Sequence, residues 1–235
     1  MVNLDSNYIN SPHDIFIDAQ GKIYFTETDN NRIGVIIPNF LRDSIKDNNG
    51  NLTSKITNQT ISENISSIIQ KSSNIQSYNF VKQWGTNGTN NGQFSNWLEG
   101  IAGDSTGNVY VDDIGNNRIQ KFDSNGKFVT KFIINGTNDG FPVTINSISV
   151  DQSDNVYVAD YNHDNIQKFD SNGNLISHWG NNGTGNGQFN GPYGIAVDSS
   201  SNVYVADSGN NRIQKFDSNG NFITKWNPVI NYTKL

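Results

Sequence analysis

The stretch that decides the fold is VYVADSGNNRIQKFDSNG, residues 203–220. Nearly the same residues occur twice before it, as VYVDDIGNNRIQKFDSNG at 109–126 and as VYVADYNHDNIQKFDSNG at 156–173. The three copies begin at Val109, Val156 and Val203, so the spacing is 47 residues in both cases. A constant period of this length is typical of an array in which one supersecondary unit is repeated.

Each unit contains four short apolar segments separated by turn residues. In the last unit the segments are YGIAVD (193–198), NVYVAD (202–207), RIQKFD (212–217) and NFITKW (221–226). Runs rich in Val, Ile, Tyr and Phe that are divided by Asp, Ser, Asn and Gly predict strands joined by hairpins. Four-stranded antiparallel sheets repeated along a chain favour an all-β fold, a β-propeller whose blades are these units.

We predict one propeller domain with four units, at about 12–84, 97–132, 144–179 and 191–226. A closed ring, an open arc and a partial ring are all compatible with four units. The first unit carries a polar insert, 38–78, where the others have a tight DSNG turn. Isoleucine spacing and a capping box predict a short amphipathic helix near 61–71. That helix would cover a sheet edge or dock a partner, and disorder is the third interpretation.

The third strand of each unit predicts that blades pack face to face. Ile119 and Phe122 lie at positions of opposite parity, so both faces of the sheet carry apolar side chains. A strand that is buried on both faces shows this pattern, whereas a half-exposed strand alternates apolar and polar residues.

Composition restricts the classes of partner. The formal net charge is −6 and the sequence pI is about 4.9, which argues against nucleic acid because phosphate binding requires clustered Lys and Arg. No apolar run reaches the length that spans a membrane, and no signal peptide is visible at the N-terminus. The chain has no cysteine, which excludes disulfides and thiol catalysis. Acidic charge and Asn-rich turns fit an extracellular or cell-surface chain, but no compartment is assigned.

The segment GPYGIAVDSSSNVYVADSGNNRIQKFDSNG, residues 191–220, resembles the NHL repeat. The likeness is close from Phe94 to Trp226 and looser in the first unit. It implies a propeller in which GIAVD forms the innermost strand and FITKW the outermost, in a family whose rings usually have six or five blades. GKIYFTETDNNRIG, residues 21–34, is also similar to repeats of streptogramin B lyases. The His and acid constellation of those enzymes cannot be placed in this sequence.

Three units carry an acidic residue and an arginine five positions apart. In a hairpin this spacing brings the two side chains together, so we expect them to brace the turn. The pairs are Glu27 with Arg32, Asp113 with Arg118, and Asp207 with Arg212. The third unit has Asn165 in place of Arg, so Asp160 is expected to lack this partner, and His163 lies close to it in sequence.

Metal sites find little support in the sequence. We predict no resident cofactor, with calcium or zinc as the alternatives. Asp and Asn are dense in the hairpin turns, but Asx-turns account for them without an ion. A zinc site would need His13, His163 and an acid to converge, and His178 is expected at the surface.

The segments that lead into the innermost strands differ from unit to unit. They contain Trp97, Phe141 and Tyr193, and such aromatic residues serve either as recognition groups or as lids on the core. We therefore predict a non-enzymatic scaffold that recognises a protein, peptide or glycan through one rim, using these three residues with Asp160 and His163. The alternative is a metal-assisted lyase or hydrolase that acts in the central channel.

Overall fold

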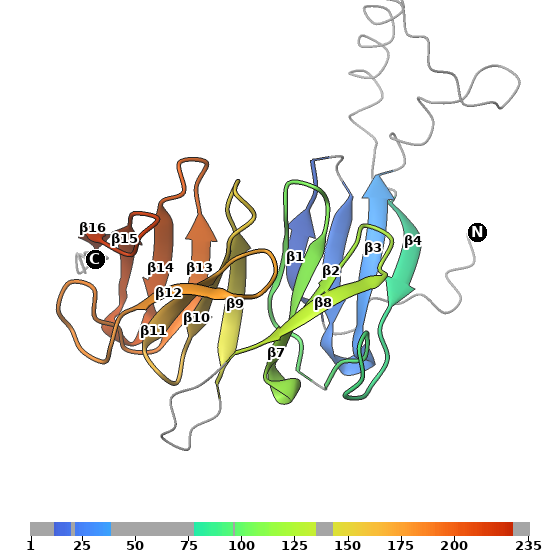
Figure 1. Ribbon diagram of the computed structural model, residues 1–235, viewed down its shortest axis with the longest axis horizontal. Helices are drawn as coiled ribbons and strands as arrows, with labels where there is room; N and C mark the ends of the chain where they lie inside the picture. The colour runs from blue at the N-terminus through green and yellow to red at the C-terminus, as the bar shows by residue number, and fades with distance from the viewer. Residues whose placement is uncertain (1–11, 20–21, 39–77, 96, 135–142, 228–235) are drawn as a thin grey trace, which may run out of the picture.

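The computed structural model describes residues 12–19, 22–38, 78–95, 97–134 and 143–227. It contains four four-stranded antiparallel sheets, each with its strands in chain order (Figure 1). This confirms the all-β prediction of propeller blades. The predicted helix near 61–71 lies outside the described residues, as does most of the insert that contains it.

The four sheets are named blades 1 to 4 in chain order. Blade 1 consists of β1 (Pro12–Ile17), β2 (Ile23–Glu27), β3 (Arg32–Pro38) and β4 (Tyr78–Trp84). Blade 2 consists of β5 (Ile101–Gly103), β6 (Val109–Asp113), β7 (Arg118–Phe122) and β8 (Phe128–Ile133). Blade 3 consists of β9 (Ile145–Val150), β10 (Val156–Asp160), β11 (Asn165–Phe169) and β12 (Leu175–Trp179). Blade 4 consists of β13 (Pro192–Val197), β14 (Val203–Asp207), β15 (Arg212–Phe216) and β16 (Phe222–Trp226).

The tight connection between the second and third strands is a single 3₁₀ turn in three blades, at Thr28–Asn30, Ile114–Asn116 and Ser208–Asn210. Each turn ends on an asparagine in the left-handed conformation, Asn31, Asn117 or Asn211, with φ near 50°. Asparagine tolerates this conformation better than most residues do, which explains the repeated GNN and DNN sequences.

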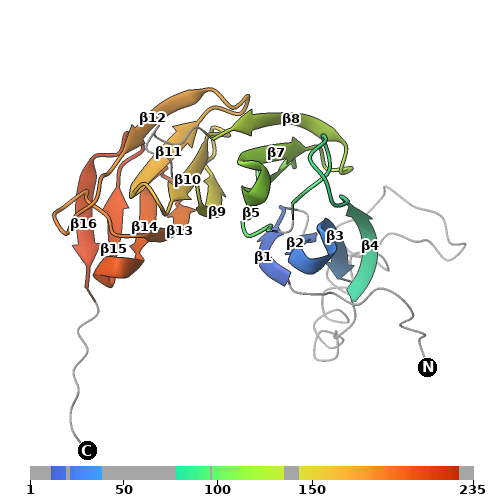
Figure 2. The ribbon, with the colours of Figure 1, turned by 90° about the horizontal axis from the view of Figure 1, so that it is seen from below.

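The blades form an open arc. β1, β5, β9 and β13 face its inner side, whereas β4, β8, β12 and β16 run along the outside (Figure 2). Blades 1 and 4 are the ends of the arc, and the side between them is open. No helix among the described residues is long and apolar enough to cross a membrane.

Each interface between neighbouring blades has its own apolar core. Ile119 belongs to the cluster between blades 2 and 3, whereas Phe122 belongs to the cluster between blades 1 and 2. Both side chains are almost fully buried, so the opposite-parity prediction is confirmed. Burial of an aliphatic or aromatic side chain contributes about 1.5–3 kcal/mol, and here it is gained only when a neighbouring blade is present.

Candidate functional site

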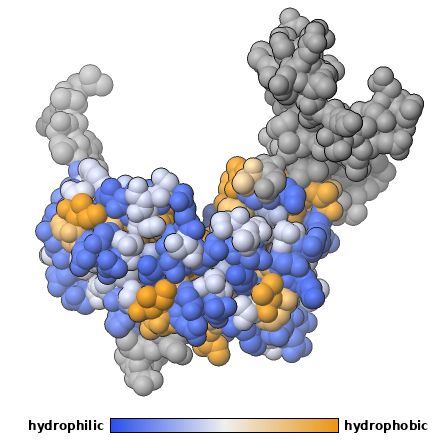
Figure 3. Space-filling model, turned by 45° about the horizontal axis from the view of Figure 1, so that its top comes forward, coloured by the Kyte–Doolittle hydropathy of each residue, from blue (hydrophilic) through white to orange (hydrophobic). Residues whose placement is uncertain are grey.

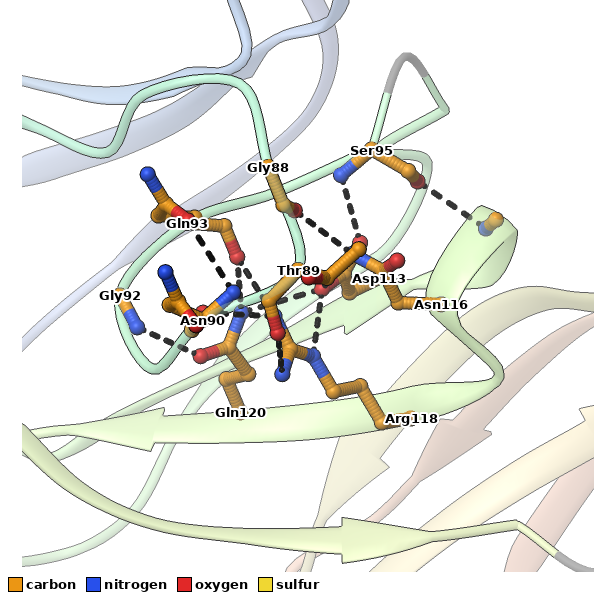
Figure 4. A network of polar contacts seen from close by, with 11 residues as sticks. Gly88, Thr89, Asn90, Gly92, Gln93, Ser95, Asp113, Asn116, Arg118 and Gln120 are labelled. Atoms are coloured by element: carbon orange, nitrogen blue, oxygen red, sulfur yellow. Dashed lines mark hydrogen bonds and ion pairs between the residues drawn. The ribbon is translucent and has the colours of Figure 1, made fainter.

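A polar network in blade 2 ties the preceding link to the blade (Figure 4). The Arg118 guanidinium donates to Asp113 Oδ2 at 2.7 Å, and its other nitrogens donate to the backbone carbonyls of Thr89, Asn90 and Gln93 at 2.7–2.9 Å. The Asp113 and Arg118 side chains are only 0% and 5% exposed. Since charge-assisted bonds in a buried site are strong, this arginine fixes the course of the link.

The same arrangement occurs in blade 4. Arg212 Nε lies 2.6 Å from Asp207 Oδ2, and its terminal nitrogens donate to three carbonyls of the link that precedes blade 4. In blade 1, Glu27 and Arg32 also form an ion pair. The structure thus brings together the acid and arginine of all three sequence pairs.

Blade 3 uses a different cation. Asp160 is fully buried, and its Oδ2 lies 2.7 Å from Nδ1 of His163, whose side chain is 3% exposed. Asp160 thus lacks the arginine partner of the other blades, and His163 takes its place. The turn between β10 and β11 brings the His163 ring back over the end of β10, where it replaces the arginine that Asn165 cannot supply.

Aromatic side chains stand exposed on the rim where links enter the blades. Trp97 is 65% exposed, Tyr193 50% and Tyr161 42%. The rings of Tyr161 and Tyr193 pack edge to face at 6.4 Å between centroids, so blades 3 and 4 share one aromatic surface. Leu98 is fully buried and belongs to the core. Phe141 lies outside the described residues.

Beside this surface is a hollow of about 210 Å³, lined by Asp14, Glu99, Asn146, Ser147, Tyr193 and Gly194. Every lining residue lies in an innermost strand or directly before one. Glu99, Asn146 and Tyr193 are separated by the 47-residue period, so they occupy the same position in blades 2, 3 and 4. Because the innermost strands converge on the inner side of the arc, one position of the repeat lines one wall of the hollow.

Carboxylates dominate the blade 1 and blade 2 side of the hollow. Asp14 Oδ2 accepts from the backbone N–H of Ile101 at 3.0 Å and thereby joins the two blades. Burial raises the pKa of Asp14, against the lowering effect of its backbone hydrogen bonds. Behind the wall, Asp112 is fully buried and accepts from the backbone N–H groups of Glu99 and Gly100 at 2.8 and 2.7 Å.

Burial raises the pKa of Asp112 well above its usual value, although its two backbone hydrogen bonds oppose the shift, and the nearby charges of Glu99 and Asp14 raise it further. Asp112 also explains why β5 is short. Its side chain bonds the two amides that precede the strand, whereas blades 3 and 4 have Ala159 and Ala206 at this position. Asp112 therefore sets the backbone that presents Glu99 to the hollow.

Sequence reasoning found Tyr193 but missed Asp14, Glu99, Asn146, Ser147 and Asp112. One signal was present in the repeats, because Asp112 stands where blades 3 and 4 have alanine. Glu99, Asn146 and Tyr193 share one repeat position, but the residues beside them, such as Leu98, Ile145 and Pro192, differ between units as well. That these positions surround one hollow could not be known before the blades were arranged in space.

Among the described residues, no group of three or more His, Asp or Glu side chains could hold a metal ion. The His13 side chain lies outside that set, and His178 is exposed. In the hairpin turns the carboxylate oxygens already accept protein hydrogen bonds. Asp151 Oδ1, for example, accepts from the backbone N–H groups of Ser153 and Asn155 at 2.9 Å. These are the Asx-turns that the composition predicted.

Comparison with known proteins gives one family match. Residues 100–231 match a family described as 6-bladed β-propeller. No curated protein matches the chain.

Among solved structures, a streptogramin B lyase superposes with a TM-score of 0.59 at 15% identity, covering 96% of this chain and 58% of the lyase. A catalytically inactive virginiamycin B lyase from Staphylococcus aureus, solved with quinupristin, gives 0.59 at 14%, covering 97% and 61%. A chain of a nidogen/laminin complex gives 0.54 at 16%, covering 93% and 64%. The chain therefore spans about three fifths of the length of these propellers, and identities this low show the fold alone.

Proposed function

Since the chain belongs to the 6-bladed β-propeller family, we propose that it is a non-enzymatic binding module of NHL-repeat type that recognises its partner through one rim. The observation that carries the proposal is the hollow lined by Glu99, Asn146 and Tyr193. The repeat position that lines the hollow changes from acid to amide to phenol between blades 2, 3 and 4, whereas the second and third strands of these blades keep nearly the same sequence. Variation in the segment that faces the hollow, carried by nearly uniform blades, suits a recognition surface on a rigid scaffold.

The rim residues take two roles in this proposal. Trp97 and Tyr193 are exposed aromatic anchors, the residue class that dominates binding energy at interfaces, and Phe141 is assigned the same role in the link before blade 3. Asp160 and His163 are buried and bonded to each other, so they position the turn that carries Tyr161. The acid–arginine pairs hold the links in place in the same way.

The lining favours a partner that carries positive charge. Asp14 and Glu99 line the hollow together with the ring of Tyr193, and a Lys or Arg side chain gains from carboxylates and from the face of an aromatic ring. A basic segment of a protein or peptide is therefore the proposed ligand, ahead of a glycan. The likeness to a propeller of a nidogen/laminin complex supports protein binding as a use of this fold.

Panning a phage-displayed random peptide library on immobilised protein tests the proposal. We expect enrichment of peptides containing Lys and Arg. Tyr193→Ala should reduce capture of the enriched clones about tenfold, the loss typical of an interface anchor. Ile223→Ala is the matched control, since Ile223 is 48% exposed but lies in an outermost strand, and it should leave capture unchanged.

Absence of enrichment, or equal capture by the Tyr193→Ala variant, would contradict recognition at this rim. Capture that depends on Tyr193 and is enriched in acidic peptides would reject the proposed ligand chemistry and keep the rim. Thermal melts of both variants should match those of the parent protein, because each side chain is about half exposed.

A further inference from the structure

Blade 3 lacks the buried arginine that blades 2 and 4 carry at the start of the third strand. Arg118 and Arg212 are 4% and 7% exposed. Each bonds the acid at the end of the second strand and three carbonyls of the preceding link, as Figure 4 shows for blade 2. Asn165 holds this repeat position in blade 3, directly opposite Asp160 in the strand pair. Because directly opposite residues of antiparallel strands point to the same face of a sheet, Asp160 and Asn165 share the place of the acid and the arginine.

The buried acid has donors for both of its oxygens in blades 2 and 4. Asp113 Oδ1 accepts from the backbone N–H of Ser95 at 2.8 Å and from Asn116 Nδ2 at 3.0 Å. Its Oδ2 accepts from Arg118 Nε at 2.7 Å. Asp207 receives the same three kinds of donor, from the entering link, the turn asparagine and the arginine. In these two blades the carboxylate is therefore paired and fully hydrogen-bonded, as a buried charge requires.

In blade 3 two buried oxygens are left without a donor. His163 stands in place of the turn asparagine and bonds Asp160 Oδ2, to which Gln167 Nε2 also donates at 3.4 Å. Among the described residues, no donor bonds Asp160 Oδ1 or Asn165 Oδ1, while Asn165 Nδ2 donates to the His163 carbonyl at 3.3 Å. Burial raises the pKa of Asp160, against the lowering effects of His163 and of the Thr144 backbone amide. Since an unpaired buried acceptor costs free energy, this site is incomplete.

We propose that the turn of blade 3 binds the guanidinium group of a ligand, in the place that the chain's own arginines take in blades 2 and 4. A planar guanidinium presents its N–H donors side by side, which suits two unpartnered oxygens on neighbouring strands. It also brings a permanent positive charge to Asp160, whereas His163 carries a charge only when protonated. A metal ion fits less well, because among the described residues no group of three or more His, Asp or Glu side chains could hold one.

The turn that carries this site lies at the surface and is held in place. Asn165 is half-buried, and Tyr161 and Asn162 of the same turn are exposed. Asn162 Nδ2 donates to Thr144 Oγ1 at 2.8 Å, and the Tyr161 ring packs against Tyr193. Much of the surface in view in Figure 3 is hydrophilic, with hydrophobic residues in separate patches, and on such a surface polar and charged contacts determine specificity. The proposed site uses none of the residues that line the hollow, so it stands apart from the function proposed above.

Titration of isotope-labelled protein with methylguanidinium, followed by NMR at constant ionic strength, tests the proposal. In the parent protein the side-chain amide signal of Asn165 and the ring signals of His163 should shift and reach saturation. Asn165→Arg supplies a guanidinium from the chain itself, so the affinity measured at His163 should fall about tenfold. Gln83→Arg is the matched control and should leave the affinity unchanged. It adds the same charge at an exposed position of an outermost strand, where blades 2 and 4 have Lys131 and Lys225.

Two further ligands define the chemistry of the site. Butylammonium carries the same charge without the planar fork of N–H groups, so it should bind about tenfold more weakly than methylguanidinium. Equal binding of the two would overturn the assignment to a guanidinium. A blocked peptide with one central arginine distinguishes the sources of the group. Tighter binding of the peptide than of methylguanidinium indicates a protein partner, whereas tighter binding of methylguanidinium indicates a free guanidino compound, and both results support the site.

Other results would reject the site. Shifts confined to Tyr193 and its neighbours, with Asn165 and His163 unchanged, would place the guanidinium in the hollow, which overturns this proposal and leaves the proposed function standing. Shifts of Asn165 on addition of calcium but not of methylguanidinium would identify a metal site and overturn the proposal as well. Absence of any shift in the folded parent protein would do the same, and this reading requires no variant to fold.

Discussion

Replacement of Arg118 by Met should destabilise the protein by about 3 kcal/mol. The variant leaves the fully buried Asp113 carboxylate without its cation, and breaking a buried pair typically costs about 3–5 kcal/mol. Asp113 keeps hydrogen bonds from Ser95 N at 2.8 Å and from Asn116 Nδ2 at 2.9 Å, which places the expected value at the lower end. The three link carbonyls that Arg118 releases lie at a part-exposed surface and can bond to water instead.

Urea denaturation followed by intrinsic fluorescence measures the effect. With a slope of about 2–3 kcal/mol per molar urea, the midpoint should fall by about 1 M. Repeat arrays can depart from two-state unfolding, so hydrogen exchange of the Gly88 and Phe94 amides provides a local readout. These two amides close the link through backbone bonds of 2.9 and 2.8 Å, and their protection should fall in the variant.

A double variant supplies the decisive control. Asp113→Asn with Arg118→Met removes the buried charge together with its partner, so it should be more stable than the sum of the single effects predicts, by about 1–3 kcal/mol of coupling. Additive single effects, or a loss below about 1 kcal/mol for Arg118→Met alone, would refute the claim that this pair holds the link. Arg32→Met should cost less, because the Arg32 side chain is 17% exposed.

Two further predictions concern the interior. Burial raises the pKa of Asp112 in the folded protein, whereas an aspartate in the unfolded chain titrates near a pKa of about 3.9. Above about pH 4 the unfolded chain therefore binds fewer protons at this residue than the folded protein does. The free energy of unfolding consequently falls as pH rises towards the folded pKa. The Asp112→Asn variant should not show this loss. Between about pH 4 and 7, its urea midpoint should therefore rise relative to that of the parent protein. A difference in midpoint that does not change with pH would contradict a raised pKa for Asp112. Gly126→Ala should lower the free energy of unfolding by about 1–3 kcal/mol more than Gly107→Ala, which is the usual cost of overpacking. Both glycines have a positive φ, but only at Gly126 does the new Cβ meet the Trp84 ring. Thermal melts measure the difference, and equal losses in the two variants would show that this contact between blades contributes nothing.

The residues around the hollow show where sequence reasoning stopped. Tyr193 could be selected because an aromatic residue in a strand-leading segment is conspicuous. Glu99 and Asn146 hold the same repeat position, but an isolated acid and amide in a polar chain suggest nothing. For Asp160 the difficulty was different. In the other units the acid pairs with an arginine five residues later, whereas the structure pairs Asp160 with His163, three residues later.

The sequence by itself determined the blade. A period of 47 residues, alternating strand and turn residues, and apolar side chains on both faces are local properties of the chain, and they specify four antiparallel strands that need neighbours. Only the tertiary structure decided which residues meet on the inner side of the arc and which faces remain uncovered. Both depend on how blades are placed relative to one another, and equal repeats become unequal only through that placement: Ile119 and Ile213 occupy the same position, yet one is buried and the other exposed.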